Sequence, residues 1–193
     1  MNSSNNDIFS LAGEVMIPQA PPDFKSGFIG IVGRPNVGKS TLMNQLVGQK
    51  IAITSPVAQT TRNRLRGILT TKEAQLIFVD TPGIHKPHHQ LGEVLVQNAK
   101  IAIESVDVVL FVVDATTLCG AGDRYIADLL SRSSTPVILG LNKIDQQVAN
   151  SLTIDESYTQ LASTHQWQTV KFSAKTGTGL GELQQLLIQN IEP

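Results

Sequence analysis

The sequence predicts an α/β fold with a mostly parallel six-stranded sheet, one antiparallel edge strand and helices on both faces. Short apolar runs alternate with segments whose apolar residues follow helical spacing, which favours a parallel sheet covered on both sides. A glycine-rich loop joins the first apolar run to the first helical segment, and polar motifs directly follow several later runs. A chain of 193 residues, 41% of them hydrophobic, is the size of one domain with a substantial core.

Short apolar runs predict the strands. The run 65–70 follows a polar loop and suits the edge of the sheet, whereas 106–113 contains the longest uninterrupted apolar stretch and predicts a central strand. The third strand ends at Asp80 and the fifth at Asn142. The predicted strands are, in chain order, 28–32, 65–70, 75–79, 106–113, 136–141 and 169–172.

Helical spacing of apolar residues predicts the helices. The first helical segment is closed by a glycine, and the last places three leucines on one face. The predicted helices are 41–48, 90–104, 123–131, 156–164 and 180–191. The polar segment 51–66 lacks a face that could pack and predicts a loop.

The residues Gly33-Arg34-Pro35-Asn36-Val37-Gly38-Lys39-Ser40 match the pattern GxxxxGK[ST] and lie between the first strand and the first helix. In this context backbone N–H groups surround a phosphate, the lysine reaches the outer phosphates and the serine hydroxyl holds magnesium. An ordinary glycine turn would not require a strand and a helix at its two ends. The pattern predicts that a nucleoside triphosphate is bound by Gly33, Asn36, Val37, Gly38, Lys39, Ser40 and Thr41.

The segment Asp80-Thr81-Pro82-Gly83 directly follows a buried strand. The strand would fix the Asp80 carboxylate near magnesium, and Gly83 would let its N–H approach the terminal phosphate. Taken alone, the segment could equally be a common turn at the end of a strand. The phosphate loop upstream favours its interpretation as part of a magnesium and phosphate site. A hydroxyl from Thr61, or alternatively Thr60, would complete the magnesium shell only while the terminal phosphate is present, which predicts a switch loop.

The motif Asn142-Lys143-Ile144-Asp145 predicts which base is bound. The Asp145 carboxylate can accept hydrogen bonds from N1–H and the exocyclic amine of guanine, and adenine lacks this donor arrangement. Asn142 can tie the base loop to the phosphate loop, and the stem of Lys143 can cover the base. An isolated copy would be a mixed-charge turn, but Ser173-Ala174-Lys175 follows the sixth strand, where the Ala174 N–H can meet guanine O6. The combination predicts GTP and GDP as ligands.

Composition excludes several other classes. Fifteen basic and sixteen acidic residues leave no excess of positive charge, so nothing predicts a nucleic-acid surface. The single cysteine, Cys119, suits a reducing compartment and predicts a small apolar residue rather than a reactive thiol. The histidines at 85, 88 and 89 predict a solvated loop rather than a metal site, because no matching cysteine or acidic cluster follows.

The ends of the chain differ in character. Residues 1–26 are polar and low in complexity, and predict a flexible leader without the features of a secretory signal; residues 27–193 form the predicted nucleotide-binding domain. No apolar run approaches the roughly 20 residues that span a bilayer, which predicts a soluble cytoplasmic protein.

These motifs together resemble the Era family of bacterial ribosome-assembly GTPases, which have a P-loop GTPase fold. The resemblance rests on the phosphate loop 33–40, the segment Gln59-Thr60-Thr61-Arg62 and the segment 80–87, and it extends over about residues 27–190. It implies GTP hydrolysis, Mg²⁺ bound with GTP or GDP by Ser40, Thr61 and Asp80, and a role in assembly of the small ribosomal subunit.

The resemblance also implies partners. Era proteins continue into an RNA-binding KH domain that contacts small-subunit ribosomal RNA, and this chain stops where that domain would begin. RNA binding is therefore expected of a domain that these residues do not include. Family membership further implies peripheral association with the inner face of the cell membrane.

One position departs from Ras-like GTPases. Where those place a water-orienting glutamine, this chain has Ile84, which cannot orient a water by hydrogen bonding, so no catalytic residue is identified with certainty. In related GTPases the residue at the position of Asn36 helps to hold a potassium ion beside the phosphates, which makes K⁺ an additional candidate cofactor.

Three alternatives stay open. The domain could belong to another Era-related GTPase, such as a tRNA-modifying enzyme or a tandem-GTPase ribosome factor. An ATP-dependent kinase would share the phosphate loop but gives no reason for Asn142, Asp145 and Ala174. A nucleotide-binding module without catalysis is compatible with Ile84.

Overall fold

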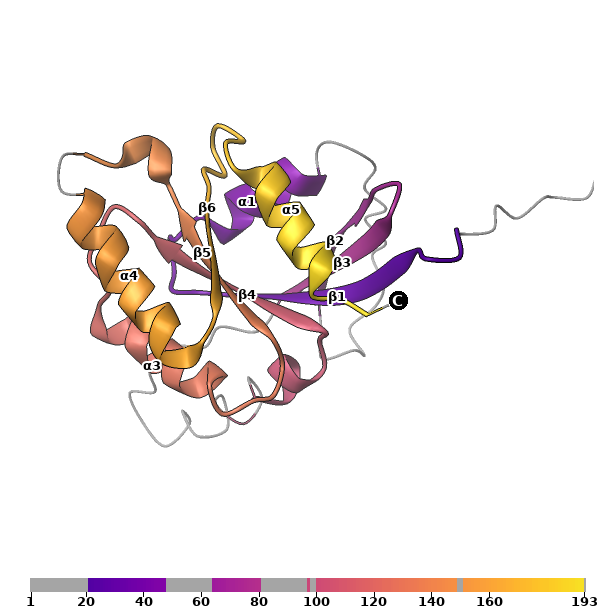
Figure 1. The fold of residues 1–193 in the computed structure, drawn as a ribbon, viewed down its shortest axis with the longest axis horizontal. Helices are drawn as coiled ribbons and strands as arrows, with labels where there is room; N and C mark the ends of the chain where they lie inside the picture. Colours follow the sequence, from indigo (N-terminus) through magenta and orange to yellow (C-terminus); the bar gives the residue numbers. More distant parts are fainter. Residues whose placement is uncertain (1–20, 48–63, 81–96, 98–99, 149–150, 193) are drawn as a thin grey trace, which may run out of the picture.

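The computed structural model describes residues 21–47, 64–80, 97, 100–148 and 151–192. Six strands form one sheet in the order β2-β3-β1-β4-β5-β6 (Figure 1). The edge strand β2 is antiparallel to β3, and the other neighbouring strands are parallel, which confirms the predicted sheet. The strands are β1 (Lys25–Val32), β2 (Arg64–Thr70), β3 (Ala74–Asp80), β4 (Val108–Asp114), β5 (Val137–Asn142) and β6 (Gln168–Lys171).

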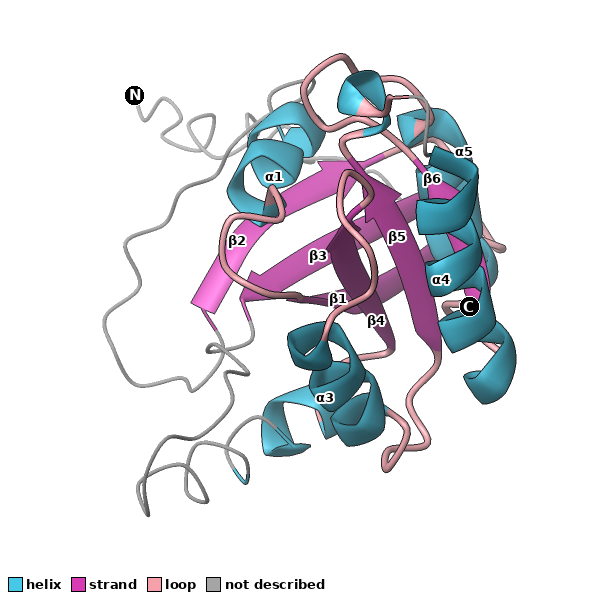
Figure 2. Ribbon diagram, turned by 90° about the vertical axis from the view of Figure 1, so that its left-hand side faces the viewer, coloured by secondary structure: helices cyan, strands magenta, loops and turns pink. Residues whose placement is uncertain are grey.

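Helices cover both faces of the sheet, and Figure 2 shows α1 above it and α3 below it. Helices α1 and α5 pack into one buried cluster, which contains Leu110 of β4, while α3 and α4 pack into a second cluster, which contains the next residue, Phe111. Consecutive residues fall in opposite clusters because successive side chains of a strand point to opposite faces. The helices are α1 (Lys39–Val47), α3 (Ala121–Leu130), the short 3-10 helix η1 (Ile144–Gln146), α4 (Ser151–His165) and α5 (Leu180–Gln189).

Strand β1 begins at Lys25, before the predicted start at residue 28 and before the predicted end of the leader at residue 26. Lys25 and Ser26 pair with Ala74 and Gln75 of β3. The Lys25 ammonium also donates to the main-chain carbonyls of Ile188 and Ile191 at 3.1 and 3.0 Å. A cation at the end of α5 satisfies carbonyls that the helix itself leaves unpaired. These contacts make Lys25 and Ser26 part of the folded domain.

Helix α4 begins at Ser151, five residues before the predicted start at 156. Its first turns contain Ile154, which is 8% exposed, and they lead to Tyr158, which is fully buried. The polar residues between them weakened the helical pattern in the sequence, whereas packing against the sheet stabilises the longer helix. For the predicted helix 90–104, residues 97 and 100–104 are described and are helical.

Cys119 occupies the apolar environment that the sequence predicts. It is 6% exposed and belongs to the cluster beneath α3 and α4. Burial, reinforced by the negative charge of Asp123, raises the pKa of its thiol above the ordinary value. A thiol that stays protonated is a poor nucleophile, so the residue acts in packing.

The carboxyl ends of the parallel strands meet at one edge of the sheet, where Val32, Asp114, Asn142 and Lys171 end their strands. In α/β sheets this edge is where ligands bind. Within the described part of the chain, no helix combines the length and the apolar character needed to cross a membrane.

Candidate functional site

The phosphate loop connects the end of β1 at Val32 to the start of α1 at Lys39. Gly33 lies so close to β4 that a Cβ there would collide with the carbonyl oxygen of Val112. Gly38 has φ +101°, and a Cβ there would collide with the side-chain amide of Asn142. Close approach of β4 therefore requires a glycine at position 33, and the positive φ together with the Asn142 side chain requires one at position 38.

Lys39 is held against the loop that precedes it. Its Nζ donates to the carbonyls of Gly33 and Arg34 at 2.8 and 2.7 Å. The ammonium thus lies against the main chain of the loop, and its predicted contact with the outer phosphates stays a prediction. Ser40 and Thr41 follow in the first turn of α1, where both are exposed and no acidic residue is present. The dipole of a helix makes its first turn favourable for an anion.

Asn142 joins three segments of the site. Its Nδ2 donates to Val37 O of the phosphate loop, and its Oδ1 accepts from the Ala174 N–H, both at 2.9 Å. The side chain is 2% exposed, so both ends of the amide are buried and both are satisfied. This geometry agrees with the predicted tie between the base loop and the phosphate loop.

The Ala174 N–H lies where the loop after β6 meets the base motif, and it donates to Asn142 Oδ1 at 2.9 Å. Its predicted contact with guanine O6 stays a prediction. The buried amide oxygen of Asn142 needs a donor, and Ala174 supplies it across the β5–β6 edge. Ala174 therefore positions Asn142.

Asp145 lies exposed in η1 and is oriented by Ser173. The Ser173 hydroxyl donates to Asp145 Oδ1 at 2.6 Å and accepts from the Thr176 N–H at 3.1 Å. One carboxylate oxygen is thus fixed by the neighbouring loop, and the carboxylate retains acceptor capacity for a ligand. Lys175 follows in the same loop and is also exposed.

Lys143 adopts a left-handed conformation with φ +70° and reaches toward two other elements. Its Nζ lies 2.6 Å from Asp114 Oδ2 and donates to Asn36 O at 2.8 Å. Burial disfavours ionisation of Asp114, but hydrogen bonds from Lys143 and Thr116 outweigh it and hold the pKa of this carboxyl below its ordinary value. Sequence reasoning missed Asp114, although it directly follows an apolar run, as Asp80 does.

Sequence reasoning also missed a contact between the phosphate loop and α3. Arg34 Nε donates to Asp123 Oδ1 at 2.7 Å, and the Asp123 side chain is fully buried in α3. Asp123 Oδ2 also accepts from the Gly120 N–H at 3.0 Å and from the Tyr158 hydroxyl at 3.4 Å. A buried carboxylate requires several donors, and one of them is the loop residue Arg34. Arg34 occupies an unspecified position of the motif, so the pattern gave no signal for it.

Several predicted residues lie outside the part of the chain that the structure describes: Thr60, Thr61, Gly83 and Ile84, together with the histidines at 85, 88 and 89. The main chain of Asp80 ends β3 and pairs with Ile31 of β1, next to the phosphate loop. Its strand therefore ends on the same edge of the sheet as Ser40. A hydroxyl and a carboxylate are oxygen ligands of the kind that Mg²⁺ prefers.

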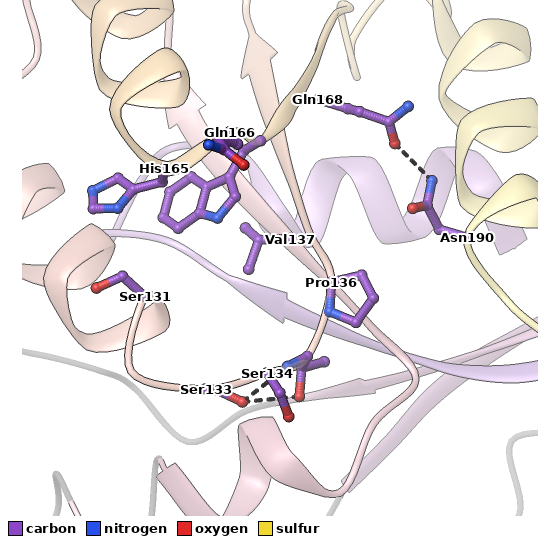
Figure 3. Close-up of a pocket in the computed structure, with 11 residues that line it drawn as sticks. Ser131, Ser133, Ser134, Pro136, Val137, His165, Gln166, Gln168 and Asn190 are labelled. Atoms are coloured by element: carbon purple, nitrogen blue, oxygen red, sulfur yellow. Dashed lines mark hydrogen bonds between the residues drawn. The ribbon is translucent and has the colours of Figure 1, made fainter.

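A separate hollow lies at the opposite edge of the sheet, at the amino ends of β5 and β6 (Figure 3). It has a volume of about 450 Å³. His165 stacks on Trp167 with ring centroids 4.5 Å apart, and Asn190 donates to Gln168 at 2.8 Å. The described residues that line it include no lysine or arginine, so it lacks the charge that a nucleotide phosphate requires.

Comparison with known proteins agrees with this geometry. Residues 28–143 match the family described as 50S ribosome-binding GTPases. The chain is 79% identical over 190 residues to the GTPase Era of Nostoc sp. (strain PCC 7120), a match that covers 98% of this chain and 59% of that protein.

Comparison with solved structures also finds similarity to Era proteins. The fold is similar to that of Era in complex with MgGDPNP and nucleotides 1506–1542 of 16S ribosomal RNA, with a TM-score of 0.71 and 38% identity. It is also similar to a variant of Aquifex aeolicus Era bound to GDP·AlF4⁻, with a TM-score of 0.70 and 38% identity. Each match covers 88% of this chain and 58% of the other chain. The chain spans about three fifths of the length of the curated relatives that it matches.

Proposed function

We propose that this chain, which belongs to the family of 50S ribosome-binding GTPases, is the GTP-binding and GTP-hydrolysing switch domain of an Era-type GTPase. The observation that carries the proposal is the connection between the two halves of the site. Asn142 bonds to Val37 in the phosphate loop, and three residues later Asp145 is oriented by Ser173. A guanine-reading carboxylate and a phosphate-binding loop are thereby held as one unit.

Guanine recognition is assigned to Asp145. Its carboxylate accepts from N1–H and the exocyclic amine of guanine, while the Lys143 stem covers one face of the base. The Lys175 side chain, exposed in the neighbouring loop, lies on the same edge of the sheet. An ATP-dependent kinase would have no use for this arrangement, which favours the GTPase over that alternative.

The phosphates are assigned to Gly33, Asn36, Val37, Gly38, Lys39, Ser40 and Thr41, with the Gly83 N–H at the terminal phosphate. Mg²⁺ is assigned to Ser40, Asp80 and a switch threonine, Thr61 in preference to Thr60. Relatives at 38% identity have been solved with MgGDPNP and with GDP·AlF4⁻, which supports a magnesium–nucleotide complex for this chain.

Hydrolysis proceeds without a water-orienting glutamine, because Ile84 occupies that position. We assign to Asn36 a role in holding K⁺ beside the phosphates, where a cation can neutralise charge that develops in the transition state. Asn36 lies in the left-handed region with φ +64°, so its side chain projects from a sharply turned part of the loop.

The domain acts in the cytoplasm, in assembly of the small ribosomal subunit. The related Era bound to a fragment of 16S ribosomal RNA supports this role. RNA contact is assigned to a KH domain beyond these residues, and peripheral association with the inner face of the membrane is proposed for the whole protein. An origin in a tRNA-modifying or tandem-GTPase relative is less well supported, because the high-identity relatives are Era proteins.

Competition titration tests the proposal. A fluorescent GDP analogue is bound to the chain in magnesium buffer and displaced with GDP, GTP, ADP or ATP. We expect guanine nucleotides to compete at concentrations roughly a hundredfold or more below those of adenine nucleotides, because adenine leaves the hydrogen bonds of Asp145 unmade. Phosphate release from GTP then measures hydrolysis. Equal competition by ATP and GTP would refute the assignment of the base.

A further inference from the structure

Two consecutive carbonyl groups of the phosphate loop are bound by two consecutive side chains of the base motif. Asn142 Nδ2 donates to Val37 O at 2.9 Å, and Lys143 Nζ donates to Asn36 O at 2.8 Å. In a planar trans peptide the N–H of the following residue points away from the carbonyl. These two contacts therefore direct the N–H groups of Val37 and Gly38 away from the base motif, toward the opposite side of their peptide planes.

Asp114 contacts the Lys143 ammonium that binds the Asn36 carbonyl. It ends β4 directly opposite Asn142 in the parallel β4–β5 register, which brings its carboxylate beside Lys143. Oδ2 lies 2.6 Å from Lys143 Nζ, while Oδ1 accepts from the N–H and the hydroxyl of Thr116 at 3.0 and 2.6 Å. Each oxygen of the Asp114 carboxylate thus has a partner, and these contacts fix the orientation of the carboxylate.

We propose that Asp114 is a positioning residue for nucleotide binding, which holds Lys143 against the Asn36 carbonyl and so fixes the phosphate loop relative to the base motif. The inference rests on the proposed function, since it assigns a role to Asp114 in the same nucleotide site.

The physical basis is the flexibility of lysine. A free lysine side chain has many rotamers, and a single neutral carbonyl is a weak partner for its ammonium. Asp114 supplies a charged partner that is itself oriented by Thr116, so the ammonium is ordered before the nucleotide arrives. Ordering a group in advance removes an entropic cost from binding.

An ordinary surface ion pair would contribute little to this protein. The Asp114–Lys143 pair differs because its side chains are 17% and 25% exposed, and because the same ammonium contacts the phosphate loop. Its effect should therefore be measured in nucleotide affinity rather than in thermal stability alone.

A double-mutant cycle on the 193-residue chain tests the inference. Asp114→Asn removes the charge and keeps the shape, and Lys143→Met removes the ammonium. We expect Asp114→Asn to weaken GDP binding about tenfold, the range measured for hydrogen bonds to charged groups. In the Lys143→Met background the same change should have almost no effect, because the group through which Asp114 acts is gone.

Three further variants separate positioning from general stability. Asp114→Glu retains the charge and should recover part of the affinity that Asp114→Asn loses. Thr116→Val removes the hydroxyl that orients Asp114, and should weaken GDP binding about twofold to threefold only while Lys143 is present. The matched control is Asp155→Asn, which breaks a pair with Lys171. The Asp155 carboxylate is also 17% exposed, and it contacts Lys171 and Gln147 rather than the phosphate loop. The GDP affinity of this variant should equal that of the unmodified chain.

The inference is overturned if Asp114→Asn binds GDP like the unmodified chain, or if it loses equal affinity in the Lys143→Met background. It is also overturned if Asp155→Asn loses as much affinity as Asp114→Asn. If Asp114→Asn does not fold, the Thr116→Val and Lys143→Met pair decides the question by the same criterion of non-additivity. Failure of the unmodified chain to prefer GDP over ADP would instead refute the proposed function itself, and with it this inference.

Discussion

The Ser173 hydroxyl donates to Asp145 Oδ1 at 2.6 Å, and this contact joins the loop after β6 to the base motif after β5. Ser173 is fully buried while Asp145 is exposed, so a fixed group orients a surface carboxylate. Ser173 also accepts from the Thr176 N–H at 3.1 Å, which fixes the hydroxyl in turn. The serine of Ser173-Ala174-Lys175 therefore orients the carboxylate to which we assign base recognition.

Asp145→Asn should shift base preference from guanine toward xanthine. Xanthine replaces the exocyclic amine of guanine with a carbonyl, which an amide N–H can meet and a carboxylate cannot. We expect GDP affinity to fall at least about tenfold while affinity for xanthosine diphosphate rises. Competition titrations with both nucleotides measure the change. Ser173→Ala is the companion variant, and it should weaken GDP binding without creating a preference for xanthine.

Lys39→Ala should severely weaken nucleotide binding, because it removes a positive charge that lies within the phosphate loop. Ser40→Ala should act differently: the Mg²⁺-dependent part of the affinity should fall, while affinity in the presence of a chelator stays nearly unchanged. Calorimetric titration with GDP, with and without Mg²⁺, separates the two effects. Normal GTP turnover by both variants would contradict the assignment of the phosphate loop.

Replacing Na⁺ with K⁺ should raise the rate of GTP hydrolysis if Asn36 helps to hold the cation, and Asn36→Ala should abolish the difference. Because Asn36 has φ +64°, alanine adds backbone strain of about 1–2 kcal/mol, whereas glycine does not. Asn36→Gly is therefore the control for strain and should also lose the response to K⁺. Phosphate release in matched sodium and potassium buffers is the measurement. A turnover indifferent to the cation would refute the role of Asn36 and leave GTP binding unaffected.

Tyr158→Phe should reduce the loss of stability at alkaline pH. Burial, with the negative charge of Asp123, raises the pKa of Tyr158 above its ordinary value of about 10. A raised pKa in the folded state contributes stability that is complete below pH 10 and is lost as pH rises toward the folded-state pKa. Phenylalanine lacks the hydroxyl that donates to Asp123, so the variant should be less stable at pH 7 by about 1 kcal/mol. Because phenylalanine cannot titrate, the variant should lose less stability than the unmodified chain between pH 10 and 11.

Urea unfolding at pH 7, 10 and 11 measures the free energy of unfolding of the variant and of the unmodified chain. The other tyrosine, Tyr125, is partly exposed in α3, and Tyr125→Phe is the matched control because it removes a phenol outside the Asp123 network. A variant at Tyr158 whose stability falls as steeply as that of the unmodified chain would contradict the prediction.

Local patterns were enough to predict the α/β class and the edge position of 65–70, which the sheet order confirms, and to propose the residues of the phosphate and base motifs. These features are local. Apolar runs and helical spacing are read within a few residues, and a glycine loop between a strand and a helix has few other uses. Their convergence also followed, because parallel strands present their carboxyl ends at one edge.

The contacts that support that site become apparent only in the folded chain. Asp114 meets Lys143 because β4 and β5 are neighbours in register, and Arg34 meets Asp123 across 89 positions of sequence. The Ala174 N–H meets Asn142 Oδ1 across 32 positions of sequence. Many donors and acceptors in the chain are chemically able to pair, and sheet register and burial decide which of them do. The pattern of residue types along the sequence contains no information on register or on burial.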